Sequence, residues 1–304
     1  RRGKGLAIRR GGRMIAAAQG LVRNSSLSYR VVMFASGSRG NSLLVAGPRS
    51  RVLIDMGLTQ RRIVADLARE QLTPKDLDAV FLTHTHHDHV GDAALKFCWR
   101  HQVPIVGPAE NLTVLRRRFR PVVERLDRAG LYRTLPPAGH HVSGLDIRAF
   151  EVPHDADGIT LGYHLTLGRG NGAEPLRVAV ATDLGEAPPE VLGALASANV
   201  LVLEANHDPE MLRRSGRPAY LIDRIRGADG HLSNSQTAAA VAEIVAHQKP
   251  GFMSHLVLAH LSQECNTPEL AQAAVRPVLA ALGSRAPRLL TAAQDQHLVV
   301  LSGK

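Results

Sequence analysis

The sequence predicts an α/β protein in which two β-sheets form a layered sandwich with flanking helices. Short apolar segments bounded by Gly, Pro and Ser recur from residue 29 onward, which is typical of a hairpin-rich sheet. Segments with helical periodicity lie mainly between the later strands. Since strands dominate the beginning and helices are interspersed afterwards, we expect helices to cover the outer faces of two packed sheets.

Ten segments are expected to form the strands of these sheets. Each is short and largely apolar, as strands buried within a layered protein are. The predicted ranges are residues 31–35, 42–46, 52–55, 79–83, 147–152, 159–167, 176–182, 200–204, 255–259 and 297–301.

Two helices are marked by the residues at their beginnings. Thr59 predicts the N-cap of a helix over residues 59–70. Its inward side chains are expected to be Ile63, Ala65 and Leu67. Thr267 followed by a proline predicts the N-cap and first residue of a helix that ends near residue 282.

Two more helices are predicted from a capping box and a charge run. Ser233 and Gln236 have the spacing in which each side chain bonds the backbone N–H of the other residue. The apolar residues that share one face behind them are Ala238, Val241, Ala242 and Val245. A helix from Asn111 carries arginines at 116–118 and 120, which form either a solvated face or a contact to a nucleic-acid backbone.

The net charge of +10 is concentrated at the front of the chain. Residues 1–30 hold eight Arg and Lys and no acid, whereas the other 274 residues carry 29 bases against 27 acids. We expect residues 1–28 to be a basic, disordered leader and residues 29–304 to form one domain, because no linker or repeat follows the leader. A start at Met14, a transit peptide and an electrostatic contact to nucleic acid are the other interpretations of the leader.

Composition excludes several classes of protein. No apolar run approaches the ~18 residues of a membrane span, so no membrane partner is expected. Two cysteines are too few for a disulfide framework or a thiolate-rich metal site, and they suit a cytoplasmic protein. A phosphate-binding loop of the flavin or nicotinamide type is absent. With 4% aromatic residues, the sequence has no aromatic stretch suited to base stacking.

The most informative motif is a histidine-rich loop that follows the strand expected at 79–83. His84, His86, Asp88 and His89 lie within six residues there. A strand end anchors the loop, and the loop lets these side chains converge. Imidazole and carboxylate are ligands of divalent zinc, manganese and iron, so the motif predicts a metal site.

The His-x-His-x-Asp-His spacing resembles the signature of the metallo-β-lactamase superfamily, whose fold is a four-layer αββα sandwich. The resemblance extends over nearly the whole chain after residue 30. It implies that Asp55 orients the histidine loop without binding metal. It also implies two metal ions: the ligands of one would be His84, His86 and His154, those of the other Asp88, His89 and His260, with Asp183 bridging them.

Two such ions ~3.5–4 Å apart can share a hydroxide and make it a nucleophile at neutral pH. We expect zinc, with manganese as the alternative. Asp88 stands where a thiolate could sit, which favours an oxygen-loving site over a soft-metal role. An oxygen-rich ligand set of this kind favours a phosphate ester as substrate.

Four further segments resemble the YycJ/WalJ-type branch, whose members are regarded as DNA-directed exonucleases. They are residues 34–42, 203–208, 229–234 and 260–266. Glu204 and His231 also resemble the acid–histidine pair of the RNase Z branch. His231 held by Glu204 would protonate the departing sugar oxygen. The alternative is that His231 only packs or caps at a turn.

Candidate phosphate contacts lie outside the metal motif. The small-residue turn with Ser36, Ser38 and Asn41 is able to present backbone N–H groups to a phosphate, or else is a tight hairpin. The remaining candidates are Arg224, Arg226 and Asn234, which flank His231 in sequence.

The sequence therefore predicts a dinuclear-metal phosphodiesterase, in particular a DNA exonuclease in which a metal-bridging hydroxide attacks phosphorus. The catalytic residues would be Asp88, Asp183, Glu204 and His231. The alternatives are a hydrolase of a carbonyl substrate such as a thioester, lactone or β-lactam, an RNase Z-like nuclease acting on RNA, and a non-catalytic nucleic-acid-binding module. The sequence leaves the oligomeric state and the direction of digestion open.

Overall fold

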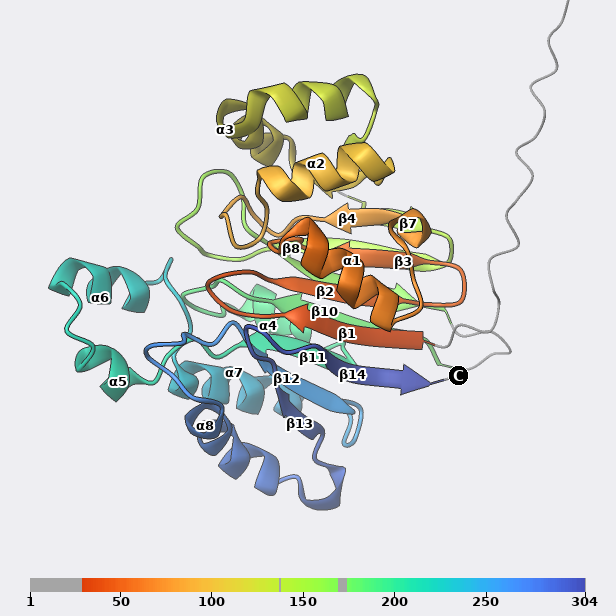
Figure 1. Cartoon of the computed structure of the whole chain (residues 1–304). Coiled ribbons are helices and arrows are strands. Elements are labelled where there is room, and N and C mark those ends of the chain that lie inside the picture. Colours follow the sequence, from red (N-terminus) through yellow and green to blue (C-terminus); the bar gives the residue numbers. More distant parts are fainter. Residues whose placement is uncertain (1–28, 137, 169–173, 304) are drawn as a thin grey trace, which may run out of the picture.

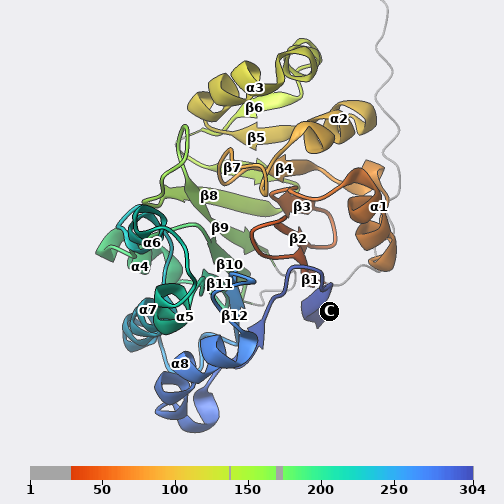
Figure 2. The ribbon, with the colours of Figure 1, turned by 60° about the vertical axis from the view of Figure 1, so that its left-hand side comes forward.

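The computed structural model describes residues 29–136, 138–168 and 174–303, which fold into two seven-stranded sheets packed face to face (Figure 1). The basic leader predicted at residues 1–28 lies outside the described residues. Helices cover the outer face of each sheet (Figure 2).

The first sheet has the strand order β14-β1-β2-β3-β4-β5-β6. Its strands are β1 (Tyr29–Ala35), β2 (Ser42–Ala46), β3 (Arg51–Ile54), β4 (Ala79–Phe81), β5 (Ile105–Gly107), β6 (Tyr132–Thr134) and β14 (Leu298–Gly303). The helices on its outer face are α1 (Gln60–Arg69), α2 (Asp92–His101) and α3 (Ala109–Arg128).

The second sheet has the order β13-β12-β11-β10-β9-β8-β7. Its strands are β7 (His140–Val142), β8 (Leu145–Glu151), β9 (Leu161–Leu167), β10 (Leu176–Ala181), β11 (Val200–Glu204), β12 (His255–Ala259) and β13 (Arg288–Thr291). The helices on its outer face are α4 (Pro189–Leu195), α7 (Asn234–His247) and α8 (Pro268–Ala280). Two short helices, α5 (Pro209–Arg213) and α6 (Ala219–Arg226), stand outside these layers (Figures 1 and 2).

Three apolar clusters separate the four layers. Val31 and Met33 of β1 point into the cluster between the sheets, whereas Val32 and Phe34 point into the cluster beneath α1, α2 and α3. This alternation is the two-residue period of a strand that is buried on both faces. A third cluster joins the second sheet to α4, α7 and α8. The αββα sandwich that the sequence resemblance implied is therefore confirmed.

The predicted helix caps are present. The side chain of Thr59 accepts a hydrogen bond from the backbone N–H of Arg62, and Thr267 does the same for Leu270. Ser233 and Gln236 form the predicted capping box. These bonds satisfy N–H groups that the first turn of a helix leaves without partners.

The predicted inward faces of two helices need correction. In α1 the buried positions include Asp66 beside Leu67, and Ala65 is exposed. Asp66 can be buried because Arg62, Arg69 and His297 all contact its carboxylate. In α7 the buried face is centred one position earlier than predicted, on Thr237, Val241 and Ile244, and Ala238, Ala242 and Val245 lie at its margin.

Parallel strand pairs bring several strand ends to one edge of the sandwich. Strand β3 pairs in parallel with β4, and β10, β11 and β12 pair in parallel with one another. Strand β8 runs in the same direction as β10, because both are antiparallel to β9. The loops that leave the carboxyl ends of these strands carry the residues of the candidate site.

Among the described residues, no helix combines the length and the apolar character that crossing a bilayer requires.

Candidate metal centre

The predicted ligands converge from four strand ends. His84, His86, Asp88 and His89 lie in the loop between β4 and α2. Each of the other three follows a strand of the second sheet, and these are His154 after β8, Asp183 after β10 and His260 after β12. The site therefore lies across the edge where the two sheets meet.

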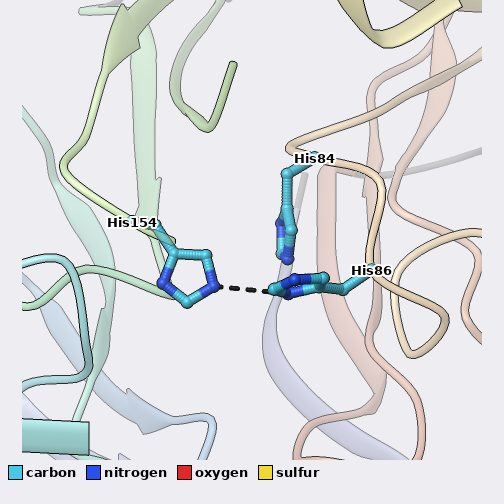
Figure 3. Close-up of side chains that lie close together, drawn as sticks. All are labelled: His84, His86 and His154. Atoms are coloured by element: carbon cyan, nitrogen blue, oxygen red, sulfur yellow. Dashed lines mark hydrogen bonds between the residues drawn. The ribbon is translucent and has the colours of Figure 1, made fainter. Parts of the chain in front are cut away.

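The first group of ligand-type atoms consists of three imidazoles. The ring nitrogens of His84, His86 and His154 lie within 4.8 Å of one another, and His154 Nε2 is 3.3 Å from His86 Nδ1 (Figure 3). Burial lowers the pKa of His86 to about 4, and it lowers the pKa of the other two histidines as well. All three rings are therefore neutral at pH 7 and have a lone pair for a cation.

The second group mixes carboxylates with imidazoles. Asp88, His89, Asp183 and His260 are all buried, and their ligand atoms lie within 4.8 Å of one another. Burial alone would raise the pKa of Asp183, but the neighbouring His260 and His89 outweigh it and hold that pKa well below its usual range. The group therefore offers anionic oxygen. Burial would lower the pKa of His89 and His260, but the neighbouring carboxylates outweigh it and raise both, that of His260 to about 10, so a cation binds these two nitrogens in exchange for a proton.

Asp183 lies between the two groups. Its Oδ2 is 3.2 Å from His89 Nε2, and its Oδ1 is 3.4 Å from His260 Nε2 and 3.9 Å from His154 Nε2. Nε2 of His84 is buried and has no hydrogen-bond partner in the part of the chain that the structure describes. A buried nitrogen of this kind is costly unless it is bound, so the donor set fits a divalent metal ion.

Three residues at this edge have a left-handed backbone. The φ angles of Asp55, Asp183 and His260 are +59°, +60° and +55°, and each residue lies within two positions of the end of its strand. Left-handed φ is uncommon outside glycine and costs free energy, and it concentrates at functional sites. The left-handed turns bring these three side chains into contact with the ligand groups directly after their strands end.

Asp55 contacts the histidine loop. Its Oδ2 accepts hydrogen bonds from His89 Nδ1 and from the Thr83 hydroxyl, both at 2.7 Å, and its Oδ1 accepts the Thr83 backbone N–H at 2.8 Å. With its proton fixed on Nδ1, His89 presents Nε2 to Asp88 and Asp183. Asp55 thus lies where the orienting residue was predicted.

Glu204 contacts two histidines, of which the sequence indicated one. Its Oε1 is 2.8 Å from Nδ1 of both His231 and His260, and its Oε2 accepts backbone N–H groups from residues 184 and 232. Burial would raise the pKa of Glu204, but the charges and hydrogen bonds of the two histidines outweigh it and lower the pKa to about 2. The carboxylate therefore links His231 to a residue of the second ligand group.

An open pocket of about 390 Å³ leads to these groups. Ser38 and Arg224, two of the predicted phosphate contacts, line it together with His231. Arg217 lines it as well and was not predicted, since it lies outside every motif. The other lining residues include His86, Asp88, His154, Asn206 and Ser262.

The other predicted phosphate contacts do not line this pocket. The buried Ser36 hydroxyl accepts the His260 backbone N–H at 2.7 Å, and the Asn41 side chain lies 2.9 Å from His89 Nε2. Asn234 forms a reciprocal amide pair with Asn266. Arg226 is exposed outside the pocket, because two positions along a helix turn its side chain about 200° away from Arg224.

The arginine run in α3 contacts the histidine loop through a backbone carbonyl. Arg117 and Arg118 both pair with Asp157, and Arg118 also donates to the Thr85 carbonyl at 2.7 Å. Thr85 lies between His84 and His86. Part of this run therefore supports the site from behind instead of forming only a solvated face.

The fold and the donor set define a metal-dependent hydrolase of the αββα class. A family model described as a beta-lactamase superfamily domain matches residues 50–253, and the chain belongs to that superfamily.

Two curated relatives and one solved structure are similar to this chain. Exodeoxyribonuclease YycJ of Bacillus anthracis is 28% identical over 251 residues, which are 81% of this chain and 88% of that protein. Exodeoxyribonuclease WalJ of Streptococcus pneumoniae is 26% identical over 256 residues, with 81% and 87% covered. The metallo-β-lactamase fold protein YhfI from Bacillus subtilis superposes with a TM-score of 0.60 at 14% identity, covering 89% of this chain and 99% of YhfI. The resemblance to the YycJ/WalJ-type branch is confirmed.

Proposed function

We propose that this protein is a DNA exonuclease that works with two divalent metal ions. The observation that carries the proposal is the position of Asp183 between a three-histidine group and an Asp–His group. The exodeoxyribonuclease names of the relatives at 26–28% identity support DNA as the substrate.

The two ligand groups would hold the ions separately. His84, His86 and His154 would bind one, with zinc favoured over manganese for an all-nitrogen set. The ligands of the other would be Asp88, His89 and His260, and Asp183 would contact both. When bound, a pair of divalent ions supplies water of lowered pKa and neutralises charge on a phosphodiester.

His231 would donate the proton that the leaving oxygen needs. Its Nδ1 faces Glu204, so the other side of the ring faces the pocket, where 21% of the side chain is exposed. The buried carboxylate of Glu204 fixes the orientation of the ring through its contact with Nδ1, and the ring centroid lies 5.1 Å from that of His154 and 5.3 Å from that of His260. The ring is therefore close enough to the ligand groups to reach a bound phosphodiester. Asp55 and Glu204 would keep His89 and His260 in the tautomers that direct Nε2 toward metal.

The buried, unpaired thiols of Cys98 and Cys265 and a DNA substrate both support a cytoplasmic location.

A panel of three substrates tests the reaction class. The metal-loaded protein should hydrolyse bis(p-nitrophenyl) phosphate, and a thioester and a β-lactam should remain intact. Asp183→Ala should abolish turnover. His247→Ala, which removes an exposed histidine at the end of α7, should leave turnover unchanged. Hydrolysis of a carbonyl substrate alone would contradict the proposal.

A further inference from the structure

Helix α6 is held beside the pocket although it contributes no buried residue to the described core. An isolated eight-residue helix is marginal in water, so contacts at its carboxyl end must hold it. The His231 N–H donates to the Ile225 carbonyl at 2.9 Å, and a Cβ at Gly230 would lie 2.2 Å from that same oxygen. The backbone next to His231 therefore packs directly against the end of α6.

One face of this segment forms a wall of the pocket. Leu221, Arg224 and Ile225 line it from α6, and Arg217 lines it from just before the helix. Ser38 from the loop between β1 and β2 and His87 from the loop between β4 and α2 line the same pocket. Two arginines thus line the same pocket as the ligand residues His86, Asp88 and His154.

Each of these arginines is paired with an exposed acid. Arg217 lies 2.7 Å from Glu264, whose side chain is 76% exposed, and Arg224 lies 2.6 Å from Asp155, which is 58% exposed. Exposed ion pairs are worth only about 0–1 kcal/mol. A phosphate, which accepts two parallel hydrogen bonds from a guanidinium, can therefore displace either carboxylate.

Tyr220 belongs to the same helix as Arg224 and does not line the pocket. It is 73% exposed, by far the most exposed of the large apolar side chains among the described residues. Tyr220 and Arg224 are four positions apart and are therefore neighbours on the helix surface. Basic side chains next to an exposed aromatic ring are what binds a single nucleic-acid strand, in which the bases are free to stack.

We infer that residues 217–226 form a strand clamp that binds one unpaired nucleic-acid strand and leads its end to the metal centre. Arg217 and Arg224 contact successive phosphates, and Tyr220 stacks on a base outside the pocket. The inference rests on the proposed nuclease function for its substrate class, and it adds the strand path and the preference for an unpaired end.

Steady-state cleavage of a labelled single-stranded oligodeoxynucleotide tests the clamp. Tyr220→Ala should raise KM at least about fivefold, since stacking contributes about 1–3 kcal/mol per base, and Tyr220→Phe should restore it. Arg217→Ala combined with Arg224→Ala should flatten the dependence of log KM on log salt by about 1.4, because each phosphate contact on a single strand contributes about 0.7. Hydrolysis of bis(p-nitrophenyl) phosphate should change little in Tyr220→Ala, because Tyr220 does not line the pocket. The arginine variant is judged on its salt dependence, because both arginines line the pocket in which that small substrate would bind.

Arg276→Ala on α8, an exposed arginine that does not line the pocket, is the matched arginine control and should keep the wild-type KM and salt dependence. An unchanged oligonucleotide KM in the clamp variants, with DNA cleavage intact, would overturn the inference and leave the proposed function standing. If no DNA is cleaved, the proposed function fails. In that case, fluorescence anisotropy of the same oligonucleotide measures whether residues 217–226 bind a single strand. Equal affinity of the wild type and the variants would refute the clamp.

Discussion

Glu204→Gln tests how the site is held together, because one buried carboxylate serves two histidines. In the native protein its two oxygens accept four hydrogen bonds, two from imidazoles and two from backbone N–H groups. A glutamine offers one accepting oxygen and one donating amide. Whichever way the amide turns, two of the four donors lose their acceptor.

The size of the effect follows from that count. A buried donor without an acceptor costs about 1–3 kcal/mol, so we expect the free energy of unfolding to fall by about 2–6 kcal/mol. Loss of a residue that orients a ligand typically weakens metal affinity about 10–100-fold, and here it would act through His260. Loss of the partner of His231 should lower kcat by about 10²–10⁴-fold.

The assay combines urea unfolding, titration of metal against a chromophoric chelator, and turnover at saturating metal. Glu243→Gln on α7, where the carboxylate is exposed, is the matched control and should change none of the three. His231→Ala should lower kcat and leave metal affinity unchanged, whereas Glu204→Gln should lower both. A Glu204→Gln protein that binds metal and turns over like the wild type would refute this account of the carboxylate.

Two further variants test the supports of the site, and a third tests the burial of His207. Asp55→Asn keeps a residue that tolerates the left-handed φ, yet it should weaken metal affinity about 10–100-fold, and an unchanged affinity would argue against an orienting role. Gly57→Ala should lower the melting temperature, because the added Cβ would lie 1.7 Å from the Asp88 carbonyl oxygen. Gly193→Ala, whose Cβ would meet no atom within 4 Å on α4, is the control and should be neutral or stabilising. Equal melting temperatures of the two variants would contradict this explanation. Burial lowers the pKa of His207 to about 4. Between pH 6.5 and 4 the unfolded chain therefore binds a proton at this histidine, whereas the folded protein does not. The free energy of unfolding consequently falls as the pH falls across that window. His207→Gln should lose less stability than the wild type between pH 7 and pH 5 in urea unfolding, and parallel losses would contradict the assignment.

The parts of the fold that the sequence predicted are those with local signals. Most strands were predicted from their apolar runs, and the caps at Thr59, Ser233 and Thr267 are set by hydrogen bonds within four residues. Strands β5, β6, β7 and β13, of three or four residues each, were not predicted. Four helices were missed, namely α2, α4, α5 and α6. The last two bury little apolar surface and so carry no periodic pattern. The inward face of α1 was wrong at Ala65, because a buried acid was not expected to take the place of an apolar residue.

The residues of the candidate site also differ in how far the sequence could predict them. Histidines and aspartates at fixed spacings after strands could be found without a structure, since strand ends bring them together. The direction in which each side chain points could not be found from the sequence. Asn234 was chosen for its place near His231, yet it turns inward to Asn266, and Arg226 lies on the far side of α6 from Arg224. The second contact of Glu204, to His260, joins residues 56 positions apart, which only the folded chain reveals.

Digestion of an end-labelled single-stranded DNA by the metal-loaded protein tests the central claim most directly. We expect the label to be released progressively from one end as mononucleotides, zinc or manganese to restore this activity after chelation, and Asp183→Ala to abolish it. Intact DNA in the presence of either metal, with a thioester or β-lactam hydrolysed by the same preparation, would contradict it.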